Sequence, residues 1–194
     1  MTYRKIALVD VDGVLLNWID AFLEKTNMSL EEFLQLEIDL PEIAVGMVNK
    51  FNCSAAVGFL KPWSDNCLWG VRQLFESGYE LHAITSFGGD IHSRELRKQN
   101  INRYYQWNAE VNMISSITFT DIGASKEEAL LKYGRDSGIP FIEDHLRHAI
   151  TGAELGFTPF LLNRSYNQNK NINKDAEDKV FRCRNWSDIV QELA

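Results

Sequence analysis

The sequence has few cysteines and no long apolar run. Its three cysteines, Cys53, Cys67 and Cys183, are widely spaced and form no CxxC pair, so neither a disulfide framework nor a zinc site is supported. No run approaches the ~18 apolar residues of a membrane span, and the N-terminal residues do not resemble a secretory signal. We therefore expect a reduced, cytoplasmic protein with no membrane partner.

Positive charge is also scarce. The chain has 20 Lys and Arg against 27 Asp and Glu, which gives a formal charge of −7 at pH 7, and the basic residues form no cluster along the sequence. Proteins that bind the nucleic-acid backbone need such clusters to contact phosphates. We therefore expect no nucleic-acid partner.

The overall composition is typical of a globular domain. Hydrophobic residues make up 45% and charged residues 24% of 194 residues, which fits one core domain with a small insertion. Short apolar runs predict strands at 6–9, 79–84, 117–120, 140–142, 158–162 and 179–183. Between and after these strands, helical patterns cover 64–78, 90–105, 125–133, 146–155 and 186–193. This alternation predicts an α/β fold, a Rossmann-like parallel sheet with helices on both faces.

The first two strands are separated by a segment that is helical throughout. Apolar residues recur at helical spacing from Leu15 to about Thr26, and Ser29 with Glu32 resembles a capping box that opens a second helix. We predict a small helical cap at 17–62, inserted into a core domain made of 1–16 and 63–194. Near the other end of the chain, we predict that the Asn-rich stretch 167–173 is a surface loop.

Polar residues that could bind a ligand or take part in a reaction follow the predicted strands. In open α/β sheets, ligands bind at the carboxyl ends of the strands. Residues placed there are Asp10, Asp12, Thr85, Ser86, Glu143 and Asp144, and Lys126 begins the helix after the third strand. Four carboxylates repel one another unless a cation lies among them, and an all-oxygen set suits Mg²⁺. The hydroxyls and the lysine suit phosphate oxygens, so the set predicts phosphoryl transfer.

Each of these features alone has an ordinary explanation as a turn, a helix start or a solvated side chain. Together they resemble the four motifs of the haloacid dehalogenase superfamily of phosphohydrolases. The first motif resembles the stretch 6–15, with its DxDG sequence, and the second resembles 81–86, which ends in Thr-Ser. Lys126 is the best match to the lone lysine of the third, with Lys132 as second choice, and 141–144 resembles the fourth.

The resemblance implies a role for each residue. Asp10 would be the nucleophile that forms an aspartyl-phosphate, and Asp12 the general acid and base. Mg²⁺ would be held by Asp10, the backbone carbonyl of Asp12, Asp144 and Glu143, which stands where the family usually has Asp. Thr85 and Lys126 are then catalytic candidates, and Ser86 and Trp18 candidates for substrate binding.

The substrate is argued from a narrower resemblance. The stretches 159–167 and 182–186 resemble the 5'(3')-deoxyribonucleotidase group, which implies a nucleoside monophosphate as the small-molecule substrate. The alternatives are a sugar-phosphate phosphatase or phosphomutase, an enzyme acting on nucleic-acid 3' phosphates, and a non-enzymatic phospho-acceptor or binding protein. Arg94, Arg97 and Arg164 are candidates to contact a second phosphate or a base, but we expect them to be surface residues. His145 either tunes the neighbouring acids or caps a helix, and the oligomeric state is left open.

Overall fold

The computed structural model describes residues 5–168 and 178–194. They contain a parallel six-stranded sheet with the order β3-β2-β1-β4-β5-β6. The strands are β1 (Lys5–Val9), β2 (Tyr79–Ser86), β3 (Ile114–Thr120), β4 (Pro140–Glu143), β5 (Thr158–Leu162) and β6 (Phe181–Cys183). The strand order reverses between β1 and β4, which is where open α/β sheets bind their ligands.

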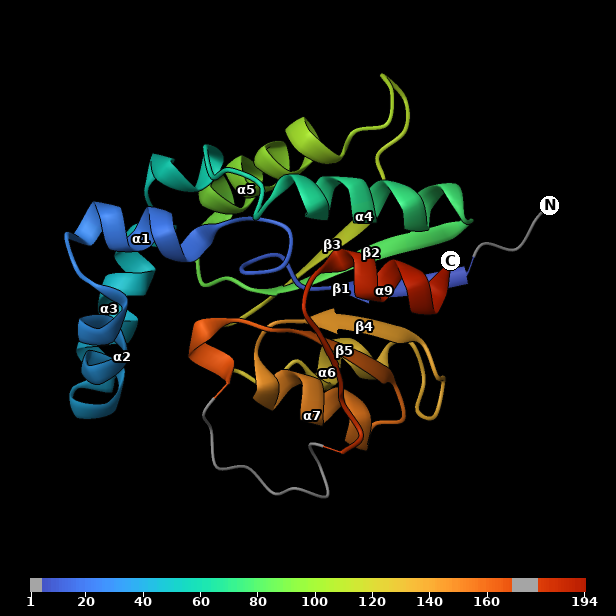
Figure 1. The fold of residues 1–194 in the computed structure, drawn as a ribbon. Helices are drawn as coiled ribbons and strands as arrows, with labels where there is room; N and C mark the ends of the chain where they lie inside the picture. Colours follow the sequence, from blue (N-terminus) through green and yellow to red (C-terminus); the bar gives the residue numbers. More distant parts are fainter. Residues whose placement is uncertain (1–4, 169–177) are drawn as a thin grey trace.

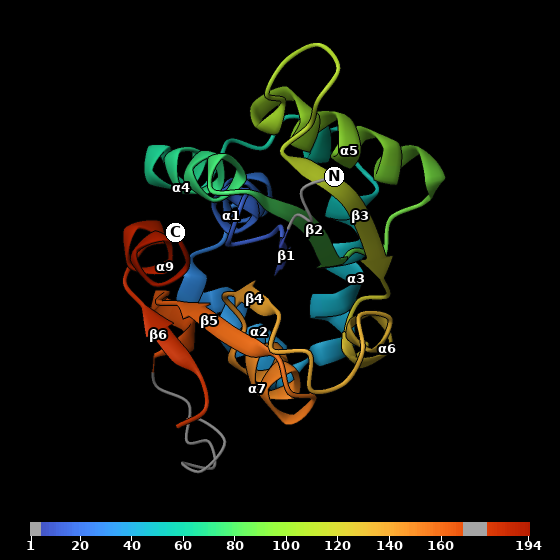
Figure 2. The same ribbon diagram turned by 90° about the vertical axis from the view of Figure 1, so that its right-hand side faces the viewer.

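Helices cover both faces of this sheet. One face carries α4 (Asp65–Glu76), α5 (Ile91–Tyr105) and α9 (Trp186–Leu193), and the other carries α6 (Glu127–Leu131) and α7 (Leu146–Glu154) (Figures 1 and 2). Successive side chains of a strand point to opposite faces. Accordingly, Ala7 and Val9 belong to one hydrophobic cluster and Leu8 to another. The predicted α/β fold with helices on both faces is confirmed.

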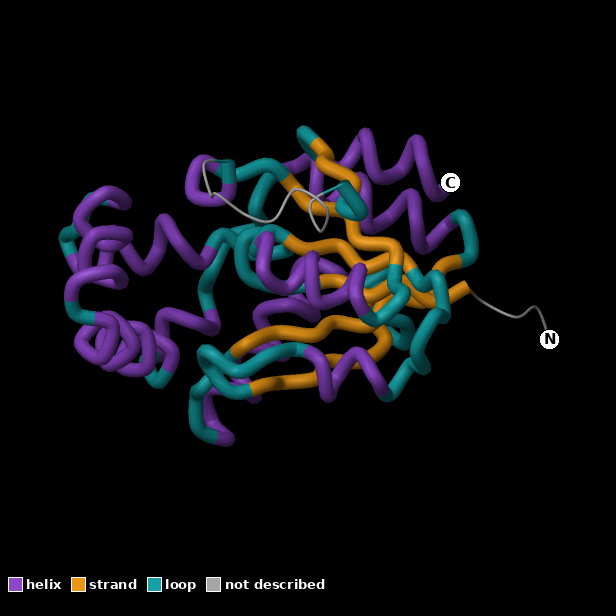
Figure 3. Tube along the Cα trace, turned by 90° about the horizontal axis from the view of Figure 1, so that it is seen from below, coloured by secondary structure: helices purple, strands orange, loops and turns teal. Residues whose placement is uncertain are grey.

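The segment between β1 and α4 is helical, as predicted. It forms α1 (Trp18–Thr26), α2 (Leu30–Asp39), α3 (Pro41–Asn52) and the short 3-10 helix η1 (Ala55–Gly58). Figures 1 and 3 show α1, α2 and α3 gathered at one end of the molecule, beyond the sheet. The predicted capping box is present: Ser29 and Glu32 each accept a hydrogen bond from the other's backbone N–H.

Aromatic side chains of the helical segment join the hydrophobic cluster that covers one face of the sheet. Phe22, Phe33 and Phe51 are buried, and the ring of Phe22 lies 4.7 Å from that of Phe33 and 5.6 Å from that of Phe51. Aromatic pairs at such distances add to the stabilisation from burial. The three helices are therefore held by packing as well as by helix propensity.

Some predicted element ends differ from the structure. The first helix begins at Trp18, although apolar residues recur at helical spacing from Leu15, because Leu16 forms a bridge with Pro62 and the carbonyl of Leu15 accepts a hydrogen bond from the N–H of Trp63. Strand β6 begins at Phe181 rather than at residue 179, since 178–180 form a turn. No helix within the two described ranges is long and apolar enough to cross a membrane.

One residue of the Asn-rich stretch, Asn167, departs from the prediction of a surface loop. Residues 169–173 lie outside the described residues. Asn167 belongs to the 3-10 helix η2 (Ser165–Asn167) and is buried. Its side-chain amide donates to the carbonyls of Asp144 and Leu162, so it joins the chain after β4 to the end of β5.

Candidate active site

The predicted site residues meet around one cavity of about 230 Å³ at the carboxyl ends of the strands. Its lining includes Asp10, Asp12, Trp18, Thr85, Ser86, Lys126 and Asp144. Glu143 is fully buried next to it and reaches the lining residues through Lys126. Lys132, the second choice for the lysine, is exposed at the end of α6, so the structure places Lys126 in the site.

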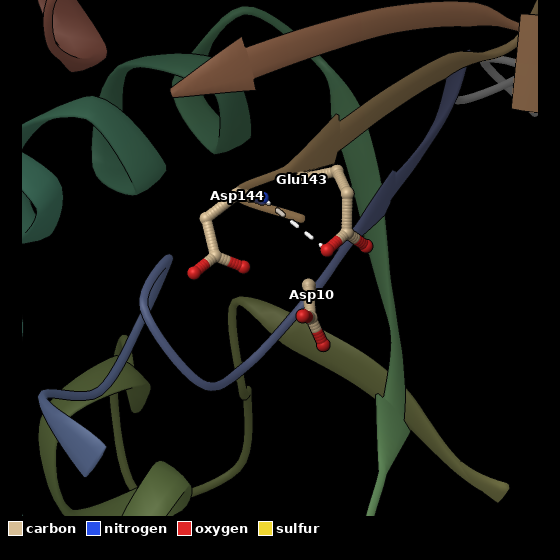
Figure 4. A group of neighbouring side chains, drawn as sticks. All are labelled: Asp10, Glu143 and Asp144. Carbon is tan, nitrogen blue, oxygen red and sulfur yellow. Dashed lines mark hydrogen bonds between the residues drawn. The ribbon is translucent and has the colours of Figure 1, made fainter. Parts of the chain in front are cut away.

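The acidic cluster follows from the pairing of β1 with β4. Val9 is in register with Ile142, and the N–H of Asp10 donates to the carbonyl of Ile142 at 2.8 Å. Asp10 therefore leaves the sheet beside Glu143 and Asp144. One carboxylate oxygen from each of these three buried residues lies within 4.8 Å of the others (Figure 4).

Lys126 joins two of these carboxylates. Its ammonium nitrogen lies 2.8 Å from Asp10 Oδ1 and 2.8 Å from Glu143 Oε2, and its side chain is 1% exposed. Burial alone would lower the pKa of Lys126, but the two carboxylates outweigh burial and raise it. The lysine is therefore a fixed positive charge at the cavity floor.

Asp12 has a cationic partner of its own. The guanidinium of Arg97 approaches it, with 2.9 Å between Nη1 and Oδ1. Burial raises the pKa of Asp12 to about 6, although Arg97 opposes the rise. The expectation that Arg97 and Arg164 are surface residues is wrong, because both are buried. Arg94 is half-buried and donates to the carbonyl of Gly89.

The charges of the site do not balance within the described residues. Burial raises the pKa of Asp10 to about 6 and that of Asp144 well above its usual range, and Glu143 adds to both rises. Of the four carboxylates, Asp10 and Glu143 form ion pairs with Lys126 and Asp12 forms one with Arg97, so two cations face four acids once Asp144 is included. If all are ionised, two negative charges are uncompensated. An oxygen cluster with this deficit fits a divalent cation such as Mg²⁺.

The hydroxyls at the end of β2 differ from each other. Thr85 is fully buried, lines the cavity, and its Oγ1 has no hydrogen-bond partner among the described residues. Ser86 Oγ lies 3.2 Å from Thr120 Oγ1. A buried hydroxyl without a partner costs free energy, so Thr85 fits a site where a ligand oxygen completes its bonding.

The segment after β5 supports the acidic cluster from the side. Arg164 Nε donates to the carbonyl of Gly13 at 2.8 Å, and the guanidinium lies 4.0 Å from the centre of the Trp63 ring. The hydroxyl of Tyr166 donates to Asp144 Oδ2. The sequence reasoning assigned Tyr166 no role; its only signal was membership of the stretch 159–167, which resembles the nucleotidase group.

Gly13 allows this arrangement because it has no Cβ. Its φ is +76°, in the region that favours glycine, and a Cβ would overlap the Asp144 carboxylate. The glycine of the DxDG sequence is therefore required both by the turn and by the close approach of Asp144.

The opposite side of the cavity is formed by α1 and α2. Its lining residues there are Trp18, Ile19, Leu30, Phe33, Leu34 and Glu37. Trp18 stacks on Phe22 with ring centres 4.7 Å apart, and its indole N–H donates to Asn52 Oδ1 at 2.8 Å. Trp18 is therefore held in one orientation, and Phe22 is buried beneath it.

Two histidines complete the lining, of which the sequence reasoning considered only His145. His145 precedes α7 as its N-cap residue but makes no side-chain capping bond. His148 lies one turn later, with ring centres 5.0 Å apart. Burial lowers the pKa of His148 to about 3, so its imidazole is neutral at pH 7.

Comparison with known proteins establishes the fold. No protein-family model matches the sequence, and no curated protein matches it either. Solved structures do match. A dehalogenase in an intermediate complex has a TM-score of 0.66 and 13% identity, with 100% of this chain and 98% of that chain covered.

Two phosphatases are also similar. A predicted phosphatase from Clostridium acetobutylicum has a TM-score of 0.65 and 12% identity over 99% of each chain. The D,D-heptose 1,7-bisphosphate phosphatase from B. bronchiseptica, in complex with magnesium and phosphate, has a TM-score of 0.59 and 15% identity over 97% of each chain. These neighbours are hydrolases of the haloacid dehalogenase superfamily, and the protein has the fold of that superfamily, as its four motifs predict.

Proposed function

We propose that this protein is a Mg²⁺-dependent phosphatase that hydrolyses a small phosphomonoester through an aspartyl-phosphate on Asp10. The observation that carries the proposal is the meeting of Asp10, Asp12, Thr85, Lys126 and Asp144 around one cavity. The uncompensated negative charge favours a bound divalent cation, and the unpartnered Thr85 hydroxyl favours a phosphate oxygen.

The acidic cluster is the proposed metal site. Asp10 and Asp144, with the backbone carbonyl of Asp12, would hold Mg²⁺ beside Glu143. Bound there, the cation would orient Asp10 and the phosphate and offset their repulsion. Glu143 already uses both oxygens, since Oε2 contacts Lys126 and Oε1 accepts the N–H groups of Asp144 and His145. We therefore assign to Glu143 the role of holding Lys126 beside Asp10.

The proposed reaction has two displacements at phosphorus. In the first, a carboxylate oxygen of Asp10 bonds to phosphorus, the ester P–O bond breaks, and the departing oxygen takes a proton from Asp12. In the second, a water oxygen attacks the phosphorus and gives its proton to Asp12, and the bond to Asp10 breaks. The products are the alcohol and inorganic phosphate. Lys126 and Thr85 stabilise the phosphoryl oxygens in both steps.

Residues 17–62 form the proposed cap over a core made of 1–16 and 63–194. The position of α1 and α2 across the cavity from the acidic cluster supports this division. A cap of this kind excludes water while the phosphoenzyme forms and contacts the part of the substrate that leaves.

The lining supplied by the cap favours a nucleoside monophosphate. Trp18, Leu30, Phe33 and Leu34 offer aromatic and aliphatic surface, which suits the flat face of a base. A sugar phosphate needs polar partners for several hydroxyls, and Glu37 is the charged residue that the cap contributes to the lining. The similarity to a heptose bisphosphate phosphatase keeps a sugar phosphate as the second candidate.

The test is phosphate release with Mg²⁺ from deoxyribonucleotides, ribonucleotides, sugar phosphates and a 3'-phosphorylated oligonucleotide, with Asp10→Asn as the control. Preference for nucleoside monophosphates supports the proposal, and preference for sugar phosphates supports the second candidate. An absence of release from every substrate contradicts the enzymatic proposal and favours a phospho-acceptor or binding role.

A further inference from the structure

Arg97 is a buried charge whose partner is a proposed catalytic group. Its side chain is fully buried on α5. A buried guanidinium is costly unless a carboxylate compensates for it, and Asp12 is the carboxylate that forms an ion pair with it among the described residues. The ring of Phe87 lies 4.9 Å from the guanidinium carbon, which adds a cation–π contact.

The geometry restrains Asp12. Nη1 of Arg97 lies 2.9 Å from Oδ1 of Asp12, and Nη2 lies 3.4 Å from Oδ2. The guanidinium therefore contacts both carboxylate oxygens, with a hydrogen bond from Nη2 to Oδ2 and an ion pair without a hydrogen bond between Nη1 and Oδ1. Two points of contact limit the rotation of the carboxylate. Arg97 does not itself line the cavity, whereas Asp12 does. Any effect of Arg97 on a substrate must pass through Asp12.

The helix that carries Arg97 is anchored at two residues that follow it. Asn100, one turn later, donates to the carbonyl of Leu60 and accepts from its N–H. At the end of α5, the hydroxyl of Tyr105 donates to the carbonyl of Leu15 at 2.7 Å. Leu15 belongs to the loop that carries Asp12, so helix and loop are held in a fixed relation. A restraint supplied from such an element is more exact than one supplied from a free loop.

We propose that Arg97 is a positioning residue that holds the Asp12 carboxylate toward the oxygen of the leaving group. The inference rests on the proposed phosphatase function and extends it, since it assigns to α5 a part in proton transfer. Loss of Arg97 would leave the phosphate site intact while the proton donor becomes misplaced.

The test compares two esters that differ in their need for a proton. An alkyl phosphomonoester releases a poor leaving group that needs the proton of Asp12, whereas p-nitrophenyl phosphate releases a stable anion that needs it little. Arg97→Met should lower kcat/KM, which reports the step that forms the aspartyl-phosphate, about 100-fold on the alkyl ester and far less on p-nitrophenyl phosphate. The second step, in which Asp12 takes the proton of water, is common to both esters and should be slowed on both, so p-nitrophenyl phosphate should release a burst of p-nitrophenolate before a slow steady rate.

Three further variants serve as controls. Arg97→Lys keeps the charge and should recover part of the loss. Arg103→Met removes an exposed arginine of the same helix that bonds to the carbonyl of Gly58, and should change neither rate more than about twofold. In an Asp12→Asn background, Arg97→Met should lower the rate little further, because the carboxylate through which Arg97 acts is already absent.

The outcomes separate the two proposals. Equal losses of kcat/KM on both esters, or a full additional loss of kcat/KM in the Asp12→Asn background, would overturn the positioning role while the phosphatase function stands. If wild-type protein hydrolyses neither ester, the proposed function fails and the role of Arg97 falls with it. Should Arg97→Met not fold, the same comparison of esters is made with Arg97→Lys.

Discussion

The two sides of the cavity differ in how their residues are held. The floor comes from the carboxyl ends of β1, β2 and β4 and from the residue that precedes α6, and it consists of Asp10, Asp12, Thr85, Lys126 and Asp144. The roof, formed by Trp18, Leu30, Phe33, Leu34 and Glu37, comes from helices packed around a cluster of phenylalanines.

From this difference we expect the floor to carry out the reaction and the roof to recognise the substrate. Floor residues are charged or hydroxylic and are fixed by strand register, so changes there should act mainly on kcat. Roof residues are mostly apolar and contact the variable part of a substrate, so changes there should act mainly on KM. The following predictions test this division.

Replacement of the nucleophile should have the largest effect. Asp10→Asn removes the carboxylate oxygen that bonds to phosphorus and should lower kcat by roughly 10⁴- to 10⁶-fold, as for other covalent nucleophiles. The measurement is phosphate release together with circular dichroism of the folded variant. Full activity in a folded Asp10→Asn protein would refute its role as nucleophile.

Removal of the metal should be nearly as severe. EDTA should lower turnover roughly a thousandfold, equivalent to the several kcal/mol that a cation contributes to charge stabilisation, and Mg²⁺ should restore it. Asp144→Asn should weaken both the rate and the affinity for Mg²⁺, which a titration of activity against Mg²⁺ measures. Turnover unchanged by EDTA would contradict the metal site.

Gly13→Ala tests how closely the floor is packed. The new Cβ would overlap the Asp144 carboxylate at a backbone with positive φ, which costs ~1–3 kcal/mol before the overlap is counted. Displacement of Asp144 should weaken Mg²⁺ binding tenfold to a hundredfold, measured by calorimetry. Gly46→Ala is the matched control, because a Cβ added there would meet no neighbouring side chain within 4 Å. Equal affinities in the two variants would show that Gly13 is not needed to place Asp144.

Trp18→Ala tests the roof. Loss of an aromatic contact worth ~0.5–1.5 kcal/mol should raise KM about three- to tenfold and leave kcat nearly unchanged. Trp69→Ala, at a position on α4 that is 43% exposed and outside the cavity lining, is the control. A change in kcat alone would contradict the proposed division between floor and roof.

His148→Gln should have the smallest effect, on stability rather than rate. Burial lowers the pKa of His148 to about 3 from its usual 6.5. In the unfolded chain the His148 imidazole is therefore protonated below about pH 6.5, whereas in the folded chain it is protonated only below about pH 3. The free energy of unfolding should fall as the pH is lowered across this window, by up to ~1.4 kcal/mol per pH unit.

Urea unfolding between pH 4 and 7 measures this slope. In His148→Gln the slope should be smaller than in wild-type protein, and His92→Gln, at an exposed position on α5, is the control. An unchanged slope in His148→Gln would show that the imidazole is not held neutral by burial.

The elements and the candidate floor were largely predictable from local pattern. Apolar runs ending in acidic or hydroxylic residues marked β1, β2 and β4, because strands buried on both faces leave continuous apolar runs that local sequence reveals. The capping box at Ser29 was predictable for the same reason, since it involves residues only three apart. The start of α1 was not, because Leu16 forms a bridge with Pro62, a residue far away in the sequence, in place of the helix that its spacing suggests.

The sequence by itself determined which residue types stand at the strand ends, and hence the α/β fold and the phosphatase hypothesis. The tertiary structure decided which of them meet. It placed Lys126 between Asp10 and Glu143, buried Arg97 against Asp12, and set Tyr166 on Asp144. These contacts join residues far apart in the sequence, so the local spacing of apolar and polar residues does not predict them. They depend on sheet order and on the cost of burying an unpaired charge, which only the assembled fold imposes.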